Sequence, residues 1–106
     1  MDYQVTILEP ALQDLESQVQ FKAERSDEDA LKHADRIFAA ANTLQQHPHR
    51  GKRIAWLEGN YRGLILPPDY HLIYQVDDQS LTVKICAVFH SSQDFQKAWG
   101  LKQRSL

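Results

Sequence analysis

The stretch "GNYRGLILPPDYHLIYQV" (residues 59–76) predicts two antiparallel strands joined by a turn. "YRGLIL" (61–66) and "YHLIYQV" (70–76) are rich in aromatic and branched side chains, and the "PPD" between them is a turn signal. Similar segments lie on both sides, "RIAWL" (53–57) and "LTVKICAVF" (81–89), connected through the short turns "EGN" and "DDQS". We therefore expect an antiparallel meander of three or four strands.

The first half of the chain predicts one strand followed by two helices. "YQVTIL" (3–8) alternates apolar and polar residues, as a strand does. Pro10 suits the first turn of a helix, and Ser26 with Asp29 resembles a capping box that starts a second helix, which Pro48 ends. The expected apolar faces are Leu12, Leu15 and Val19 on the first helix, and Ala30, Ala34, Ile37, Phe38, Ala41 and Leu44 on the second.

A last segment, "SSQDFQKAWGLK" (91–102), predicts a short helix capped by Ser91 or Ser92, with Phe95, Ala98 and Trp99 on one face. This order predicts an α+β fold in one domain over residues 1–106. Its twisted antiparallel sheet has four to five strands, including the N-terminal strand, and a two-helix hairpin covers one face. The opposite face is left partly open, and we expect a ligand to bind there.

The composition limits the class of protein, its partners and its location. The 106 residues are 42% apolar and 25% charged, as in ordinary globular proteins. The net charge is −2, from 12 basic and 14 acidic residues, whereas a protein that binds nucleic acid usually has a basic excess. A single cysteine, Cys86, and the lack of a signal peptide or membrane span favour a cytoplasmic protein.

The chain resembles the RelE/ParE superfamily of toxins from bacterial toxin–antitoxin modules. Similar residues run through "YQVTILEPALQDLE" (3–16), "ALKHADRIFAAANTLQQHPHRGKRIAWLEGNYRGLIL" (30–66) and "YHLIYQVDDQSLTVKICAVFHSSQDF" (70–95). The most specific parts are L-x-x-x-P-x-x-G at the helix end, G-x-Y-R entering a strand, Y-x-L-I-Y-x-V, and V-F-H closing the last strand. Their order and spacing together carry the resemblance.

This resemblance implies one of two activities. RelE-like members cut mRNA on the ribosome, whereas ParE-like members bind and poison DNA gyrase. Members of both branches are restrained by a cognate antitoxin that wraps around the toxin, so a hetero-oligomer with an antitoxin is expected. A third possibility is an inert homologue that only binds an antitoxin.

RNA cleavage through the 2′-hydroxyl needs a base, an acid and a cation near one phosphate. The candidates are Arg62 for charge stabilisation and His71 and His90 for proton transfer, with Lys52 and Arg53 as additional phosphate contacts. Each of the first three also has a structural alternative: an ion pair for Arg62, a solvated side chain on the open face for His71, and a hydrogen-bonded corner for His90.

The other histidines, the cysteine and the two tryptophans are not expected to take part in catalysis. His33, His47 and His49 are expected on the surface, and the last two are not spaced as metal ligands. Cys86, Trp56 and Trp99 are expected to pack in the core. We expect no metal and no cofactor.

The ParE-like branch is favoured, because the acid–base set is incomplete. The resemblance implies that RelE-like RNases carry several basic residues, or a glutamate base, across the sheet face. Here the strand that holds this base in some members is "RIAWL", without an acid, and the last strand, "CAVFH" (86–90), has no arginine. The chain also continues from His90 to Leu106, as ParE-like members often do. We therefore expect a non-enzymatic toxin that binds DNA gyrase, with the ribosome and mRNA as the alternative target. The expected target- or partner-binding residues are Arg62, Tyr70, His90, Asp94, Phe95 and Trp99.

Overall fold

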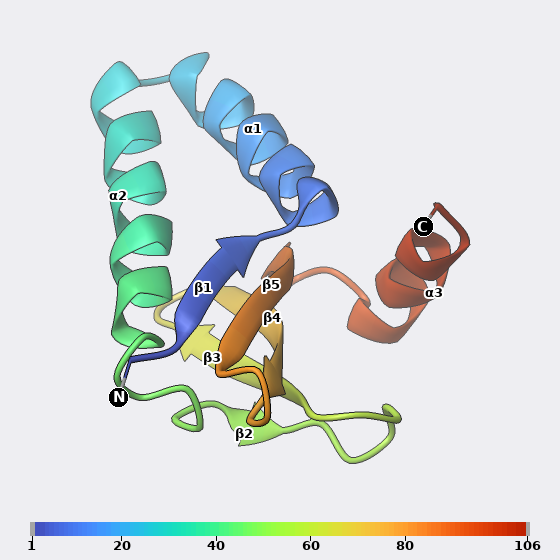
Figure 1. Cartoon of the computed structure of the whole chain (residues 1–106). Coiled ribbons are helices and arrows are strands. Elements are labelled where there is room, and N and C mark those ends of the chain that lie inside the picture. Colours follow the sequence, from blue (N-terminus) through green and yellow to red (C-terminus); the bar gives the residue numbers. More distant parts are fainter. Residues whose placement is uncertain (1, 106) are drawn as a thin grey trace.

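The computed structural model describes residues 2–105, with side chains as far as residue 100. A two-helix hairpin and a third helix surround one sheet (Figure 1). The elements are β1 (Gln4–Ile7), α1 (Glu9–Ala23), α2 (Asp27–Thr43), β2 (Lys52–Arg53), β3 (Tyr61–Leu66), β4 (Tyr70–Asp77), β5 (Thr82–His90) and α3 (Phe95–Ser105). The predicted α+β fold is confirmed.

The five strands lie in the order β1-β5-β4-β3-β2. The meander β2–β5 is antiparallel, as the turn signals predict, and Leu64 lies opposite Leu72 in its centre. Only β1 pairs in parallel, with Val5 opposite Val83 on β5. The helical hairpin makes this possible, because it carries the chain across the sheet between β1 and the meander (Figure 1).

The helix-facing side of the sheet holds the larger core. Tyr70, Leu72, Tyr74 and Val76 of β4 are all buried there, as their alternation predicts. Buried side chains of the hairpin and of the neighbouring strands complete this core, among them Ala11, Leu15, Ile37, Ala41, Leu44, Leu64, Val83, Ile85 and Val88.

In α2, His33 faces the core and Phe38 faces solvent, the reverse of the prediction. Phe38 is 46% exposed, and His33, expected on the surface, is only 3% exposed. The buried positions are Ala30, His33, Ile37, Ala40 and Ala41, which recur every three or four residues. The predicted start is confirmed, because the Asp29 N–H donates to Ser26 Oγ at 3.2 Å.

The prediction that "RIAWL" (53–57) is a strand is wrong. β2 contains only Lys52 and Arg53, and the chain then turns, with the Leu57 N–H donating to the Ile54 carbonyl at 3.2 Å. As a result Trp56, expected in the core, is 49% exposed. Gly59 has a φ of 97°, a left-handed conformation that favours glycine, so the turn back into β3 is encoded in the sequence.

Helix α3 covers part of the opposite sheet face. Ile73, Ala87, Phe89 and Trp99 form a second buried cluster, so the packing role predicted for Trp99 is confirmed. The predicted cap at Ser91 or Ser92 is wrong: Asp94 caps α3, accepting the Lys97 N–H at 3.2 Å. Within the described part of the chain no helix is long and apolar enough to cross a membrane.

Candidate functional site

The three candidate catalytic residues lie on both faces of the sheet. Arg62 is paired with Tyr74 and His90 with Tyr70, so both lie on the helix-facing side. His71 follows Tyr70 in β4 and lies on the opposite face. Because their partners are four residues apart in β4, Arg62 and His90 are separated along the strand by about 13 Å. No arrangement of base, acid and cation around one phosphate results.

Arg62 braces a loop against the sheet. Its Nη1 donates to the carbonyl oxygens of Gly51 at 2.8 Å and His49 at 3.2 Å. The Gly51 N–H in turn donates to the hydroxyl of Tyr74 at 2.8 Å. These contacts answer why an arginine interrupts an apolar strand: it fixes the chain segment that leads into β2.

His90 occupies the corner between β5 and α3. Its Nδ1 accepts the Ser92 N–H at 3.0 Å, and its Nε2 lies 3.6 Å from an oxygen of Asp69. The ring also meets Tyr70 edge-on, with 5.1 Å between centroids. Tyr70 itself is only 7% exposed, between His90 and His33. Both residues therefore contribute to the fold at this corner.

The remaining expected binding residues lie in α3 or directly before it. Asp94 caps the helix, and Trp99 is buried against Tyr61, with 5.4 Å between ring centroids. Phe95 is half-buried and bridges the second cluster to the surface, contacting Phe89 at 5.1 Å and Trp56 at 5.4 Å between centroids. Of these three side chains, Phe95 is the one that lines the uncovered part of the sheet face, together with Ile65 and His71.

The uncovered part of the sheet face forms a shallow hollow beside α3, here called the open-face hollow. It exposes two large apolar side chains, Trp56 (49%) and Ile65 (72%). The full lining is Lys52, Arg53, Ile54, Trp56, Gly63, Ile65, His71, Ile73 and Phe95, with no carboxylate among these residues. The hollow therefore combines two aromatic rings, three isoleucine side chains, two cations and an imidazole.

The sequence analysis missed Ile65 and misplaced Trp56. The signal for Ile65 is present: in "YRGLIL" it has the opposite parity to Leu64 and Leu66, which face the hairpin. Trp56 carried no such signal, because its exposure depends on β2 ending at Arg53.

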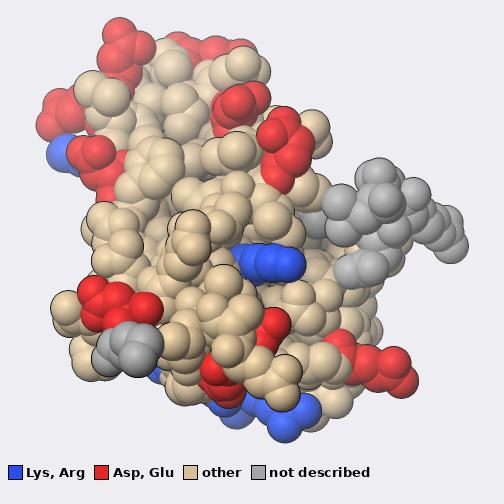
Figure 2. All heavy atoms as spheres, in the orientation of Figure 1, with Lys and Arg blue, Asp and Glu red and all other residues tan. Residues whose placement is uncertain are grey.

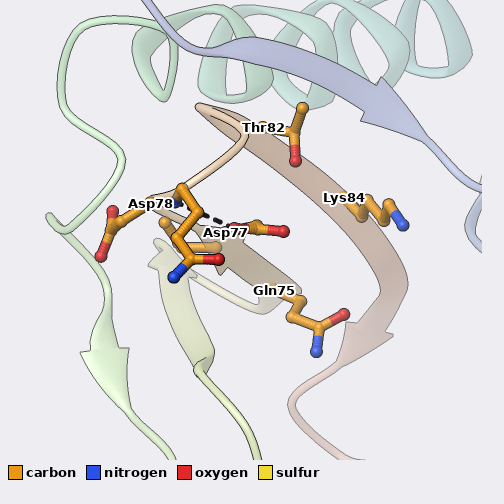
Figure 3. Close-up of a pocket in the computed structure, with 7 residues that line it drawn as sticks. Gln75, Asp77, Asp78, Thr82 and Lys84 are labelled. Atoms are coloured by element: carbon orange, nitrogen blue, oxygen red, sulfur yellow. Dashed lines mark hydrogen bonds between the residues drawn. The ribbon is translucent and has the colours of Figure 1, made fainter.

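A second hollow lies at the turn between β4 and β5, and Figure 3 shows its side chains. Asp77 accepts the N–H groups of Gln79 and Ser80, at 3.0 and 3.2 Å, and so shapes the turn. Asp78 points away from Lys84 in Figure 3 and accepts hydrogen bonds from Tyr3 and His49. These acids serve the fold. Among residues 2–105, no three His, Cys, Asp or Glu side chains gather as metal ligands.

A buried histidine connects the hairpin to the sheet. The Gln18 Nε2 donates to the Val88 carbonyl at 2.9 Å, which leaves Gln18 Oε1 to accept from His33 Nε2 at 2.8 Å. The Nε2 of His33 therefore carries a proton. Burial, followed by the cations of Lys22 and Arg36, lowers the pKa of His33 from 6.5 to about 4.

We predict that this histidine makes the protein less stable in acid. The unfolded chain binds a proton at His33 below pH 6.5 and the folded chain only below about pH 4. The free energy of unfolding should therefore fall as the pH drops through this window, by about 1–3 kcal/mol. Urea unfolding at pH 7 and pH 4.5 measures the effect. The drop should shrink in His33→Leu and persist in His47→Leu, an exposed control; equal drops in both variants would contradict the assignment.

A protein-family model matches most of the chain. The family model described as "ParE toxin of type II toxin-antitoxin system, parDE" matches residues 5–95. The chain belongs to this family. The predicted membership of the RelE/ParE superfamily is thereby confirmed, and the ParE-family chain is a toxin of a type II toxin–antitoxin system.

Solved structures of similar fold come from both RelBE and ParDE toxin–antitoxin systems. The RelBE2 toxin–antitoxin complex from Mycobacterium tuberculosis has a chain that is 23% identical, with 85% of this chain and 99% of that chain covered and a TM-score of 0.62. A chain of the chromosomal ParDE system from P. aeruginosa is 20% identical, with 83% of this chain and 95% of that chain covered and a TM-score of 0.70.

A mutant of the E. coli toxin RelE in the free state is 17% identical, with 97% of this ParE-family chain and 98% of that chain covered and a TM-score of 0.57. At these identities the similarity concerns the fold alone. No curated protein matches the chain significantly.

Proposed function

We propose that the chain is a ParE-like toxin that inhibits DNA gyrase by binding it, without hydrolytic chemistry of its own. The separation of Arg62, His71 and His90 over two sheet faces carries this proposal. RNA cleavage needs proton transfer on both sides of one phosphate, and these residues do not converge on one.

The open-face hollow is the proposed docking surface for gyrase. Exposed Trp56 and Ile65 supply apolar area, and the ring of Phe95 packs against that of Trp56, with 5.4 Å between their centroids. Protein interfaces favour such aromatic anchors surrounded by polar groups, here Lys52 and Arg53. The absence of carboxylates from the lining suits an acidic surface on the target.

Neutralisation by a cognate antitoxin is part of the same proposal. Two of the similar structures are described as toxin–antitoxin systems. On this chain, the hairpin exposes Phe21, Leu31 and Phe38, at 60%, 66% and 46%. Exposed apolar side chains on helices suit a partner segment that wraps around them. The resulting hetero-oligomer is proposed to be cytoplasmic.

One observation favours a second candidate, a ribosome-dependent mRNA endoribonuclease. His71 shares the open-face hollow with Lys52 and Arg53, and Trp56 offers a ring on which a base could stack. This set supplies cations and one proton-transfer group. It lacks the second acid–base group among its lining residues.

Two assays with the purified protein separate these functions. We expect inhibition of gyrase supercoiling and no cleavage of mRNA on programmed ribosomes. His71→Gln keeps a polar side chain but cannot transfer protons, so gyrase inhibition should change less than about threefold. mRNA cleavage that His71→Gln reduces by about 100-fold would overturn the proposal. No activity in either assay, with antitoxin binding retained, would identify an inert homologue.

A further inference from the structure

The net charge of −2 is distributed unevenly between the helical hairpin and the rest of the chain. Residues 1–44 contain nine acidic and four basic residues, a net charge of −5, whereas residues 45–106 contain five acidic and eight basic residues, a net charge of +3. The side chains over the hairpin, at the top of Figure 2, are mostly acidic, and basic side chains gather along the lower edge, where Figure 1 places β2. Such an asymmetry orients a protein toward a polyanion.

The positive charge is concentrated in one segment. "HPHRGKR" (47–53) connects α2 to the sheet and includes β2. It contains three cations, Arg50, Lys52 and Arg53, and two histidines, His47 and His49, and all five side chains are exposed. β2 is an edge strand, so no further strand covers its outer side. We call these five residues the basic edge.

The cations of the basic edge are not neutralised by acidic side chains. Arg50 donates to the hydroxyl oxygen of Thr43 at 2.7 Å, and none of the three cations forms an ion pair with a carboxylate that the structure describes. Asp78 contacts the segment through His49, at 2.8 Å. Like charges this close in the chain repel one another, so a bound polyanion would stabilise the arrangement.

The segment is held in place before any ligand binds. Arg62 Nη1 donates to the carbonyl oxygens of His49 and Gly51, at 3.2 and 2.8 Å. The Gly51 N–H donates to the hydroxyl of Tyr74 at 2.8 Å. Binding by a fixed segment loses less conformational entropy than binding by a mobile loop. The contacts of Arg62 therefore present the cations in a fixed arrangement.

We propose that the basic edge binds the sugar–phosphate backbone of double-stranded DNA. Lys52 and Arg53 also line the open-face hollow, beside exposed Trp56 and Ile65. A partner that covers both must offer apolar surface and negative charge side by side, as an enzyme bound to DNA does. The choice of DNA over RNA rests on the proposed gyrase target, which holds duplex DNA. The inference adds a direct contact between the toxin and the DNA.

A DNA-binding assay without gyrase tests this contact. The full chain is titrated into a short fluorescent DNA duplex, and fluorescence anisotropy gives the dissociation constant at several salt concentrations. Each phosphate contact contributes about 0.9 to the slope of log Kd against log salt, so three cations predict a slope of about 2.7. No binding at about 50 mM salt would overturn the proposal and leave the proposed gyrase inhibition unaffected.

A charge-matched pair of variants locates the contact. Lys52→Gln with Arg53→Gln removes two cations of the basic edge, and Arg25→Gln with Lys32→Gln removes one arginine and one lysine that are exposed on the hairpin side. We expect Kd to rise about tenfold or more and the salt slope to fall by about 2 in the edge variant, and Kd to change less than about threefold in the control. Equal losses in both folded variants, checked by thermal melting, would overturn the assignment.

A duplex RNA of the same sequence distinguishes the two nucleic acids. Because the proposed contacts are with phosphates, the RNA is expected to bind no more tightly than the DNA. RNA that binds about tenfold or more tightly than DNA would overturn the DNA assignment, since recognition would then depend on the 2′-hydroxyl or on the shape of the RNA helix.

Arg50 separates this proposal from docking on gyrase, because it lies outside the open-face hollow. We expect the wild type to bind the gyrase–DNA complex about tenfold more tightly than gyrase alone, and Arg50→Gln to lose about threefold or more of this difference. Equal binding of the wild type to both forms would overturn the DNA contact alone. If the wild type binds neither form, the proposed function fails, and the assay with DNA alone still decides the basic edge.

Discussion

Gyrase inhibition is expected to fall by at least about 100-fold when Trp56 and Ile65 are both replaced by alanine. The two side chains are the large apolar groups exposed in the open-face hollow, at 49% and 72%. Truncation of a central anchor typically costs an interface about 2 kcal/mol or more, and two such losses exceed two orders of magnitude in affinity. A supercoiling titration with each purified variant gives the inhibitory concentration.

The matched control carries the same two kinds of truncation on the hairpin. Leu31 and Phe38 of α2 are 66% and 46% exposed and lie away from the hollow. In the absence of antitoxin, Leu31→Ala with Phe38→Ala should inhibit gyrase within about threefold of the wild type. Equal inhibition by both double variants would remove the open-face hollow from the mechanism.

Gly51→Ala is expected to lower the free energy of unfolding by about 3 kcal/mol. A β-carbon on Gly51 would lie 2.6 Å from the hydroxyl oxygen of Tyr74 and 2.9 Å from the carbonyl oxygen of Gly63. Tyr74 is fully buried and cannot swing away. The shift that relieves the clash would also weaken the hydrogen bonds that Gly51 makes with Tyr74 and Arg62.

Gly100→Ala is the control for this substitution. Its β-carbon would meet no atom within 4 Å, and the residue lies inside α3. Alanine there should stabilise the protein by up to about 1 kcal/mol, because it favours the helix. Chemical unfolding of both variants gives the two free energies. A Gly51→Ala protein as stable as the wild type would show that this loop packs less tightly than the structure indicates.

The fold was predictable because local patterns agreed with one another. Alternation in "YHLIYQV" assigned each β4 side chain to its face, and Ser26 with Asp29 marked the start of α2. Both signals depend on residues a few positions apart. The parallel pairing of β1 with β5 was not predictable in this way, since it joins residues at opposite ends of the chain.

The site was less predictable, because it depends on register and on distant partners. Alternation shows which side chains of one strand share a face, but it does not relate the faces of two strands. Because Ile65 pairs with His71 across β3 and β4, Arg62 and His71 lie on opposite faces of the sheet. His33 looked like a surface residue because its partner, Gln18, lies on the other helix. A buried polar residue is accepted only with such a partner, and a window along one helix does not contain it.

The position of β5 has a consequence for how the chain is synthesised. This strand emerges late, yet it lies between β1 and β4 and contributes Ile85 to one core and Phe89 to the other. A nascent chain that has not yet extended past His90 cannot close either core. Prematurely terminated products should therefore be unfolded and harmless to the cell, and toxicity should appear only once translation has passed the final strand.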